Sequence, residues 1–180
     1  MDFLIESFKH WPTIGAFAPC SSAVAEKMTR PVDFSRARVL VEFGGGTGAI
    51  TKTILARMRP DAELVSFELL PAFVSALKRI PDSRLTVVHD SAANLGAYLA
   101  AREIEKADAI ISTLPVGTMN KALRARIFEE VKGALGTGGR YVQIQYSLLS
   151  WKEIKRNFPE TSLDFTPRNF PPAFFYICER

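Results

Sequence analysis

The sequence contains little cysteine and no long apolar run, and both shortages exclude classes of protein. Its 180 residues include two cysteines, Cys20 and Cys178, which lie near opposite ends and cannot form the framework of a disulfide-rich scaffold. No stretch approaches the roughly 18 consecutive apolar residues that a membrane-spanning helix requires. Glycine and proline number 11 each and are scattered along the chain, which excludes a low-complexity protein.

The N-terminal residues lack the features of a secretory signal peptide. Met1 is followed by Asp2 and Glu6, with no basic region ahead of an apolar core. The few cysteines also fit a reducing compartment better than a secreted one. We therefore expect a cytoplasmic protein with one domain over residues 1–180.

The charge balance is mildly basic. Lysine and arginine total 23 against 19 acidic residues, which gives a net charge of +4. Such an excess suits nucleic acid or an anionic membrane surface, but it is also common among proteins that bind neither. Thirteen phenylalanines are more than a core of this size needs. We expect most of them inside and some along an apolar substrate groove.

The spacing of apolar residues alternates between strand and helix periods, and this alternation indicates the fold class. Short branched runs predict five strands, and apolar residues at helical spacing predict a helix after each of the first four. This order predicts a doubly wound α/β fold, whose parallel sheet carries helices on both faces. Two further strands with no helix between them predict an antiparallel hairpin at one sheet edge. The expected strands cover residues 38–43, 63–67, 85–88, 108–111, 140–146, 162–165 and 173–178.

A glycine-rich turn separates the first strand from its helix, where residues 42–48 read EFGGGTG. Glycines let the backbone turn sharply and let a ligand approach, and the N–H groups of the following helix can bind an anion. A purely structural turn would explain two of these glycines. Because four occur in five residues, we expect a ligand at Gly44, Gly46 and Gly48.

The glycine spacing alone does not identify the ligand, because Gly44, Gly46 and Ala49 also satisfy the dinucleotide pattern. Glu42 argues against a dinucleotide, since its carboxylate would repel a pyrophosphate but could pair with an amino group. The chain also leaves no room for the second half of a dehydrogenase. A ligand with an ammonium and a carboxylate fits better, and S-adenosylmethionine carries both.

Acidic residues follow the next two strands. Glu68 ends the second strand, where it could accept from ribose hydroxyls, and Asp90 ends the third, where it could accept from an adenine amino group with Ser91 beside it. A single acid at a strand end is usually a helix cap or a solvated turn. Three acids at the carboxyl ends of adjacent strands instead indicate one ligand crevice.

The spacing of Glu42, the glycines, Glu68 and Asp90 resembles that of class I S-adenosylmethionine-dependent methyltransferases. This resemblance implies a Rossmann-like sheet of seven strands with an antiparallel last strand, which agrees with the predicted hairpin. It also implies S-adenosylmethionine as the methyl donor, and no metal.

Three further segments resemble bacterial phospholipid N-methyltransferases. Residues 15–22 resemble the Gly-Ala-x-x-Pro-Ser-Ser segment of that family, with Cys20 in place of a serine. Residues 112–115 resemble its Ser-Gly-Leu-Pro, which implies that Ser112 contacts the donor and Leu114 the substrate. Residues 168–176 resemble its Asn-x-Pro-Pro-Ala-x-x-Tyr ending. The second segment is shared with adenine N6-methyltransferases that act on RNA, and the Tyr-Gly-Pro expected after the fifth strand is replaced by Tyr146-Ser147-Leu148.

Methyl transfer to an amine requires the neutral amine, whereas an alkylamine with a pKa of about 10.4 is almost entirely protonated at pH 7. Burial beside Tyr146 or the backbone of Leu114 could favour and orient the free amine, although Tyr146 could also simply pack in the sheet. Arg168 and Asn169 could hold a lipid phosphate, or Asn169 could shape the turn before the two prolines.

Two segments could contact a membrane. Phe3, Leu4 and Phe8 gather on one side of an expected N-terminal helix within residues 1–30, which could lie in the bilayer interface or cover the donor. Residues 151–156 carry a tryptophan and three basic residues, which indicate either a second contact or a solvated face.

The sequence therefore predicts an N-methyltransferase that acts on phosphatidylethanolamine or a related aminolipid, with no obligate protein partner. Such an enzyme could act as a peripheral protein on the inner face of the membrane. An adenine N6-methyltransferase of ribosomal RNA is the alternative enzyme. A donor-binding module without turnover is the alternative of another class.

Overall fold

The computed structural model describes residues 21–167 and 171–180. Residues 1–20 of the predicted N-terminal helical segment, with its apolar side chains, lie outside these residues, as do Arg168 and Asn169. The helices are α2 (Ser22–Thr29), α3 (Ala49–Arg57), α4 (Pro71–Leu77), α5 (Leu95–Ala101), α6 (Lys121–Ala134) and α7 (Trp151–Asn157), with a 3₁₀ helix η1 at Ala92–Asn94. The strands are β1 (Val39–Phe43), β2 (Glu63–Phe67), β3 (Leu85–Val88), β4 (Ala107–Ser112), β5 (Leu135–Gln145), β6 (Thr161–Thr166) and β7 (Ala173–Glu179).

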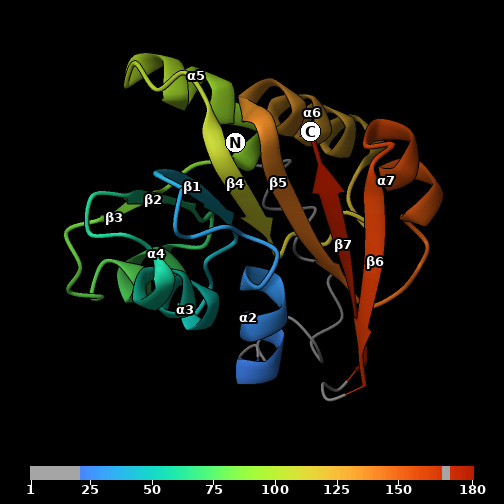
Figure 1. Ribbon diagram of the computed structural model, residues 1–180, viewed down its shortest axis with the longest axis horizontal. Coiled ribbons are helices and arrows are strands. Elements are labelled where there is room, and N and C mark those ends of the chain that lie inside the picture. The colour runs from blue at the N-terminus through green and yellow to red at the C-terminus, as the bar shows by residue number, and fades with distance from the viewer. Residues whose placement is uncertain (1–20, 168–170) are drawn as a thin grey trace.

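The strands form one sheet of seven in the order β3-β2-β1-β4-β5-β7-β6 (Figure 1). The first five run parallel, and β7 lies antiparallel between β5 and β6. Helices α5, α6 and α7 cover one face, and α2, α3 and α4 cover the other (Figure 1). The predicted doubly wound fold and its C-terminal hairpin are confirmed.

The central strand β1 shows why the sequence folds in this way. Leu40 packs into the core on the α2–α3 face, whereas Val41 and Phe43 pack into the core on the α5–α6 face. A strand that is buried on both sides needs apolar residues in succession, as in parallel sheets generally. The polar exception is Glu42, which is fully buried.

Two elements differ from the sequence prediction. Strand β5 begins at Leu135, directly after α6, and ends at Gln145, so Tyr146 follows the strand instead of closing it. The sequence did not predict the first half of β5, because the glycines at 136, 138 and 139 have low strand propensity. Helix α7 was not predicted, although Ile154 and Phe158, three and seven residues after Trp151, are buried at helical spacing.

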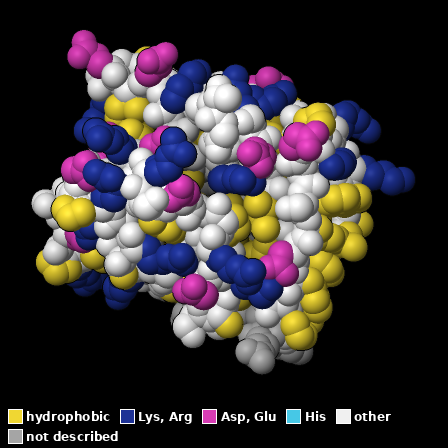
Figure 2. Space-filling view, in the orientation of Figure 1, with side chains coloured by type: hydrophobic (Ala, Val, Ile, Leu, Met, Phe, Trp, Pro, Cys, Tyr) yellow, Lys and Arg dark blue, Asp and Glu magenta, His cyan; other side chains and the backbone are white. Residues whose placement is uncertain are grey.

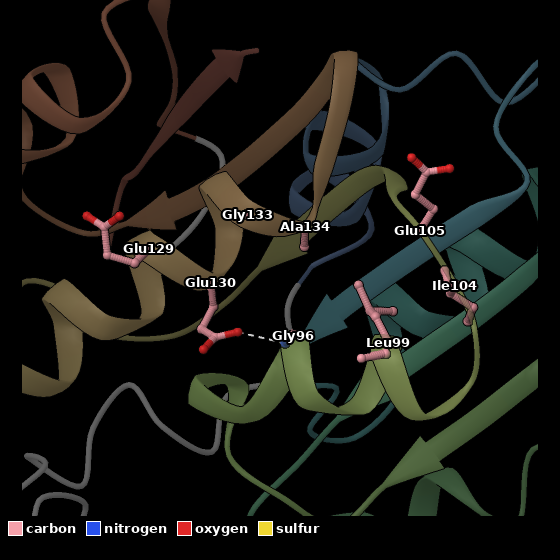
Figure 3. Close-up of a pocket in the computed structure, with 9 residues that line it drawn as sticks. Gly96, Leu99, Ile104, Glu105, Glu129, Glu130, Gly133 and Ala134 are labelled. Atoms are coloured by element: carbon pink, nitrogen blue, oxygen red, sulfur yellow. Dashed lines mark hydrogen bonds between the residues drawn. The ribbon is translucent and has the colours of Figure 1, made fainter.

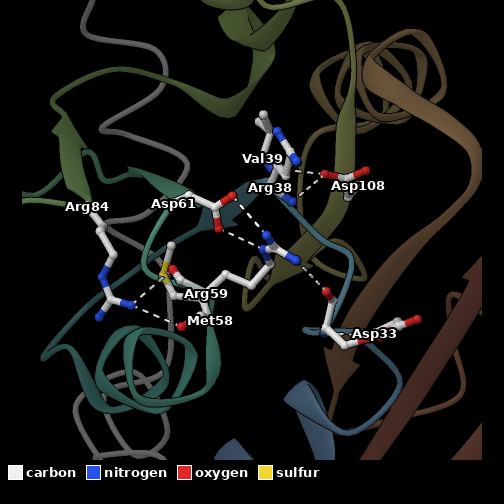
Figure 4. A network of polar contacts seen from close by, with 9 residues as sticks. Asp33, Arg38, Val39, Met58, Arg59, Asp61, Arg84 and Asp108 are labelled. Atoms are coloured by element: carbon white, nitrogen blue, oxygen red, sulfur yellow. Dashed lines mark hydrogen bonds and ion pairs between the residues drawn. The ribbon is translucent and has the colours of Figure 1, made fainter.

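The amino-terminal edge of the parallel strands is held by a polar network (Figure 4). The Asp108 carboxylate accepts hydrogen bonds of 2.7 and 2.9 Å from the N–H groups of residues 38 and 39, which fastens β4 to the start of β1. The Arg84 guanidinium donates to the carbonyl oxygens of Met58 and Arg59, just beyond the end of α3. These contacts satisfy backbone groups that the helix end leaves without partners. They serve the fold at the edge opposite the glycine-rich turn.

Candidate functional site

The glycine-rich turn connects β1 to α3 at the carboxyl edge of the sheet. Gly44, Gly46 and Gly48 have φ angles of +79°, +55° and +84°, in the left-handed region that favours glycine. At Gly45 the constraint is space, because a Cβ atom there would lie 2.5 Å from Oγ of Ser66. The turn therefore depends on its glycines, and at Gly46 the nearest atom of the described residues to such a Cβ would be 4.0 Å away. That opening leaves room for a ligand at the start of α3.

Glu42 lies buried beneath this turn. Its Oε2 accepts hydrogen bonds from the hydroxyls of Thr51, at 2.7 Å, and Ser66, at 2.6 Å, which join β1 to α3 and β2. Its Oε1 is buried and has no hydrogen-bond partner among the described residues. Burial raises the pKa of Glu42 from 4.5 to about 7, although the two hydroxyls favour its ionised form. A buried acceptor without a donor is costly unless a ligand supplies one.

Glu68 follows β2 and holds the turn from the other side. Its Oε2 accepts from the N–H of Gly46 at 3.0 Å, and its Oε1 accepts from the N–H groups of Leu69 and Leu70. The carboxylate is nearly buried, with 8% of the residue exposed. A carboxylate oxygen has two lone pairs, so Oε2 retains capacity for one more donor.

Asp90 and Ser91 follow β3 at the same edge of the sheet. Oδ1 of Asp90 accepts from the N–H of Ser91 at 2.7 Å and from the side chain of Asn94 at 2.9 Å. Ser91 is buried, and its hydroxyl accepts from the N–H of Ala93 as the cap of η1. The cap of η1 is thus Ser91, a role that the sequence analysis did not give it, whereas the Asp90 side chain is exposed.

The segment after β4 is fastened to the glycine-rich turn. The Thr113 hydroxyl donates to the carbonyl oxygen of Gly44 at 2.7 Å, and the Thr113 N–H donates to that of Phe43. Ser112 is fully buried, and its hydroxyl accepts from the N–H of Leu114 at 3.3 Å. Residues 112–114 therefore lie directly against the turn.

Two glutamines of β5, which sequence reasoning missed, hold Leu114. The Nε2 atoms of Gln143 and Gln145 donate to the Leu114 carbonyl oxygen at 2.8 and 2.9 Å. Oε1 of Gln145 accepts from the N–H of Gly117 at 3.2 Å. Both glutamine side chains are buried and alternate with the apolar residues Val142 and Ile144 at the end of β5, and this alternation was the signal that could have revealed them. They therefore occupy the Leu114 carbonyl oxygen.

The structure gathers most of the predicted site residues at one edge. Phe43 pairs with Phe67 of β2 and Ser112 of β4, so Glu42, Glu68 and the segment after β4 adjoin. Tyr146 follows Gln145 at this same edge and is 41% exposed, so it does not pack within the sheet as the alternative interpretation required.

A separate hollow of about 400 Å³ lies between α5 and α6 (Figure 3). It is lined by Leu99, Glu105 and Glu130, among others, and Glu130 accepts from the N–H of Gly96 at 2.6 Å. Because Glu105 precedes β4 and α6 ends directly before β5, this hollow belongs to the amino-terminal side of the sheet. It is remote from the glycine-rich turn.

Two other kinds of feature are absent from the part of the chain that the structure describes. No group of three or more metal-ligating side chains occurs there. None of its helices is long and apolar enough to cross a membrane.

Comparisons with known proteins find that the chain is similar to methyltransferases. The family model of an O-methyltransferase domain matches residues 15–162. The chain is 36% identical over 181 residues to an ornithine lipid N-methyltransferase of Singulisphaera acidiphila, covering 98% of this chain and 93% of that protein. It is 33% identical over 96 residues to ribosomal RNA small subunit methyltransferase H of Burkholderia vietnamiensis, covering 53% of this chain and 29% of that protein.

A solved structure has the same fold. The N-methyltransferase NodS from Bradyrhizobium japonicum WM9, in complex with S-adenosyl-L-homocysteine, matches with a TM-score of 0.67 at 14% identity, over 87% of this chain and 85% of that one. At this identity the likeness concerns the fold alone. The two matches that span most of this chain carry the assignment of a family.

Proposed function

Since the chain belongs to the class I S-adenosylmethionine-dependent methyltransferases, we propose that it methylates the amino group of an aminolipid, such as an ornithine lipid or phosphatidylethanolamine. The family uses S-adenosylmethionine as its methyl donor. The observation that carries the substrate proposal is the similarity to the ornithine lipid enzyme, which extends over 98% of this chain and 93% of that protein. If the two proteins shared the donor site alone, the similarity would not extend to both ends of the two chains.

The residues at the carboxyl edge fit the donor. The unpartnered Oε1 of Glu42 is the buried acceptor that the ammonium group requires, and the opening at Gly46 leaves space beside the first N–H groups of α3. We assign the turn at Gly44, Gly46 and Gly48 to the methionine end of the donor. When bound, S-adenosylmethionine supplies a methyl group on a positively charged sulfur.

The remaining donor contacts follow from strand order. Oε2 of Glu68 can accept from ribose hydroxyls, and the exposed Asp90 can accept from the adenine amino group. Ser91 and Ser112 act through the backbone groups that their hydroxyls bind, next to these contacts.

The substrate amine must reach the donor in its neutral form, with its lone pair aimed at the methyl group. We assign the hydroxyl of Tyr146 to orient the amine. Tyr146 is accessible, and it directly follows Gln145, which binds the Leu114 carbonyl oxygen. The side chain of Leu114 would contact the substrate and help to exclude water, which favours the uncharged amine. Arg168 and Asn169 remain our candidates for the acidic part of a lipid head group.

The test is to supply the purified protein with radiolabelled methyl donor, vesicles that contain ornithine lipid or phosphatidylethanolamine, and ribosomal RNA. We expect label in the lipid fraction. Label in RNA alone would support the second enzyme, towards which the 96-residue similarity to a ribosomal RNA methyltransferase points. Donor binding without label in either fraction would contradict the proposal.

A further inference from the structure

The exposed large hydrophobic side chains of the described residues fall in two short segments at one side of the molecule. Leu149 is 83% exposed and Leu148 48%, in the loop between β5 and α7. Leu163 and Phe165 on β6 are 41% and 44% exposed. Isolated exposed apolar residues are ordinary, but their concentration in one place marks an interaction surface.

Aromatic packing through the buried Tyr176 links the two segments. Phe165 pairs with Phe174 across β6 and β7, and their ring centroids lie 5.1 Å apart. The next aromatic of β7 on that face, Tyr176, stacks on Trp151 at 5.9 Å, and its hydroxyl donates to the carbonyl of Ser147. We call this surface the apolar edge; it comprises Leu148, Leu149, Trp151, Leu163, Phe165 and Phe174. Figure 2 shows a band of hydrophobic side chains along the side of the molecule that β6 forms.

Basic side chains border the apolar edge. Lys152, Lys155 and Arg156 are exposed on α7, and Lys152 and Arg156 have no ion pair within the described part of the chain. The acid of the helix, Glu153, is neutralised by Arg124 at 2.7 Å. Glu160 is the exposed acid that follows the helix, so the flank keeps an excess of positive charge.

The apolar edge also adjoins the methyl-transfer site. Tyr146 joins the end of β5 to the loop that carries Leu148 and Leu149. Gln145, one residue earlier, holds the Leu114 segment and lies in register with Phe174 of the apolar edge. A lipid docked on this surface would therefore lie beside the Leu114 segment, which is fastened to the glycine-rich turn through Thr113.

We propose that the apolar edge and the basic residues of α7 dock the protein on an anionic bilayer, with Leu148 and Leu149 inserted among the lipids and Lys152 and Arg156 at the head groups. The proposal rests on the proposed function, because it supplies the route by which an aminolipid enters the site. Charge complementarity favours an anionic bilayer over a second copy of this chain, whose equivalent surface would bring the same positive charges. Amphipathic surfaces of this composition bind membrane interfaces.

The experiment compares wild type with Leu148→Ser/Leu149→Ser and with Lys152→Glu/Arg156→Glu. Sedimentation uses vesicles of phosphatidylethanolamine with either phosphatidylglycerol or phosphatidylcholine. We expect the leucine variant to lose at least about tenfold in vesicle affinity, and the charge variant to lose about fivefold per residue on the anionic vesicles only. The matched control is Lys52→Glu/Lys78→Glu, which makes the same charge change on exposed residues of α3 and at the end of α4 and should bind as wild type does.

Methylation assays separate docking from chemistry. On vesicles the leucine variant should lose activity in proportion to binding, but on a short-chain phosphatidylethanolamine present as monomers it should match wild type. Equal loss on both substrates would place the leucines in the substrate site and overturn the docking proposal, as would unchanged vesicle binding. Vesicle binding that depends on these residues, without methylation of any aminolipid by wild type, would instead overturn the proposed function alone.

Two controls keep the result interpretable. Donor affinity and thermal unfolding report whether each variant folds, and Leu149→Ser alone, at the most exposed position, is the fallback if the double variant does not. Sedimentation velocity tests whether a second copy of this chain binds the apolar edge instead of a membrane. A wild-type dimer that the leucine variant dissociates, with vesicle binding unchanged, would make this surface an interface between copies and overturn the proposal.

Discussion

The Ser66 hydroxyl donates a 2.6 Å hydrogen bond to Oε2 of Glu42 beneath the glycine-rich turn, while Oε1 of the same carboxyl has no partner among the described residues. One carboxyl group thus joins two strands and presents a buried acceptor to the site. Joining the strands stabilises the fold, whereas the buried acceptor is the part of the group that we assign to ligand binding. Under our assignment of Oε1 to the donor, protonation of Glu42 would link stability to donor binding.

Stability should therefore decrease as Glu42 ionises. Its pKa is raised from 4.5 to about 7 by burial, so the folded state binds more protons than the unfolded state between these values. The stabilisation is fully present below pH 4.5 and is lost as the pH rises through 7, by an amount on the order of 3 kcal/mol in the free energy of unfolding. Urea denaturation of wild type and Glu42→Gln across this range measures it. The difference between the two should fall with pH; a constant difference would contradict the elevated pKa.

Substitution of Asp90 and of Glu68 should have different effects on donor affinity and on stability. Asp90→Ala should weaken S-adenosylmethionine binding by about 1–3 kcal/mol with little change in stability, because Asp90 is exposed. Glu68→Ala should weaken it by a similar amount and also destabilise the fold, since three backbone N–H groups lose their acceptor. Calorimetric titration and thermal unfolding measure the two effects. Asp61→Ala, at an exposed acid beside Arg59, is the control for donor binding. If both variants bind the donor as wild type does, our placement of the donor is wrong.

Much of this arrangement could be predicted from sequence, because it depends on local patterns. Apolar periodicity predicted the strands, and four glycines after a buried strand predicted the turn. Local patterns do not identify the partners of Thr113, Gln143 and Gln145, since each side chain donates to a backbone carbonyl that is distant in sequence. The Leu114 carbonyl, predicted to be available to the substrate, is occupied for the same reason. Long-range pairing, not local propensity, decides which polar groups are already satisfied.

Gln145 should act as a positioning residue. Gln145→Leu removes one donor from the Leu114 carbonyl and the acceptor of the Gly117 N–H, which should destabilise the fold by about 1–3 kcal/mol. The Leu114 carbonyl oxygen would then keep Gln143 as its one side-chain donor, beside the N–H of Val116, so kcat should fall while donor affinity stays within about twofold of wild type. Gln145→Glu keeps the acceptor for Gly117 but loses the donor to Leu114. It should therefore recover part of the stability without recovering kcat. Recovery of both would assign Gln145 a structural role only.

Tyr146 should affect the substrate amine, which accepts the methyl group, and should not affect the binding of S-adenosylmethionine. Tyr146→Phe keeps the ring but removes the hydroxyl that we assign to orient the amine, which corresponds to about 1–3 kcal/mol, or roughly 5- to 150-fold in kcat. Donor affinity should not change, because Tyr146 follows β5 and the assigned donor contacts follow β1, β2 and β3. Steady-state methylation of a monomeric short-chain aminolipid measures kcat without a contribution from membrane docking. Tyr98→Phe is the matched control, since the Tyr98 ring packs on Phe67 and its hydroxyl contacts only Arg102 among the described residues. An unchanged kcat in Tyr146→Phe would leave Tyr146 as part of the surface beside the apolar edge, and the orienting group would then have to come from elsewhere at the same edge of the sheet.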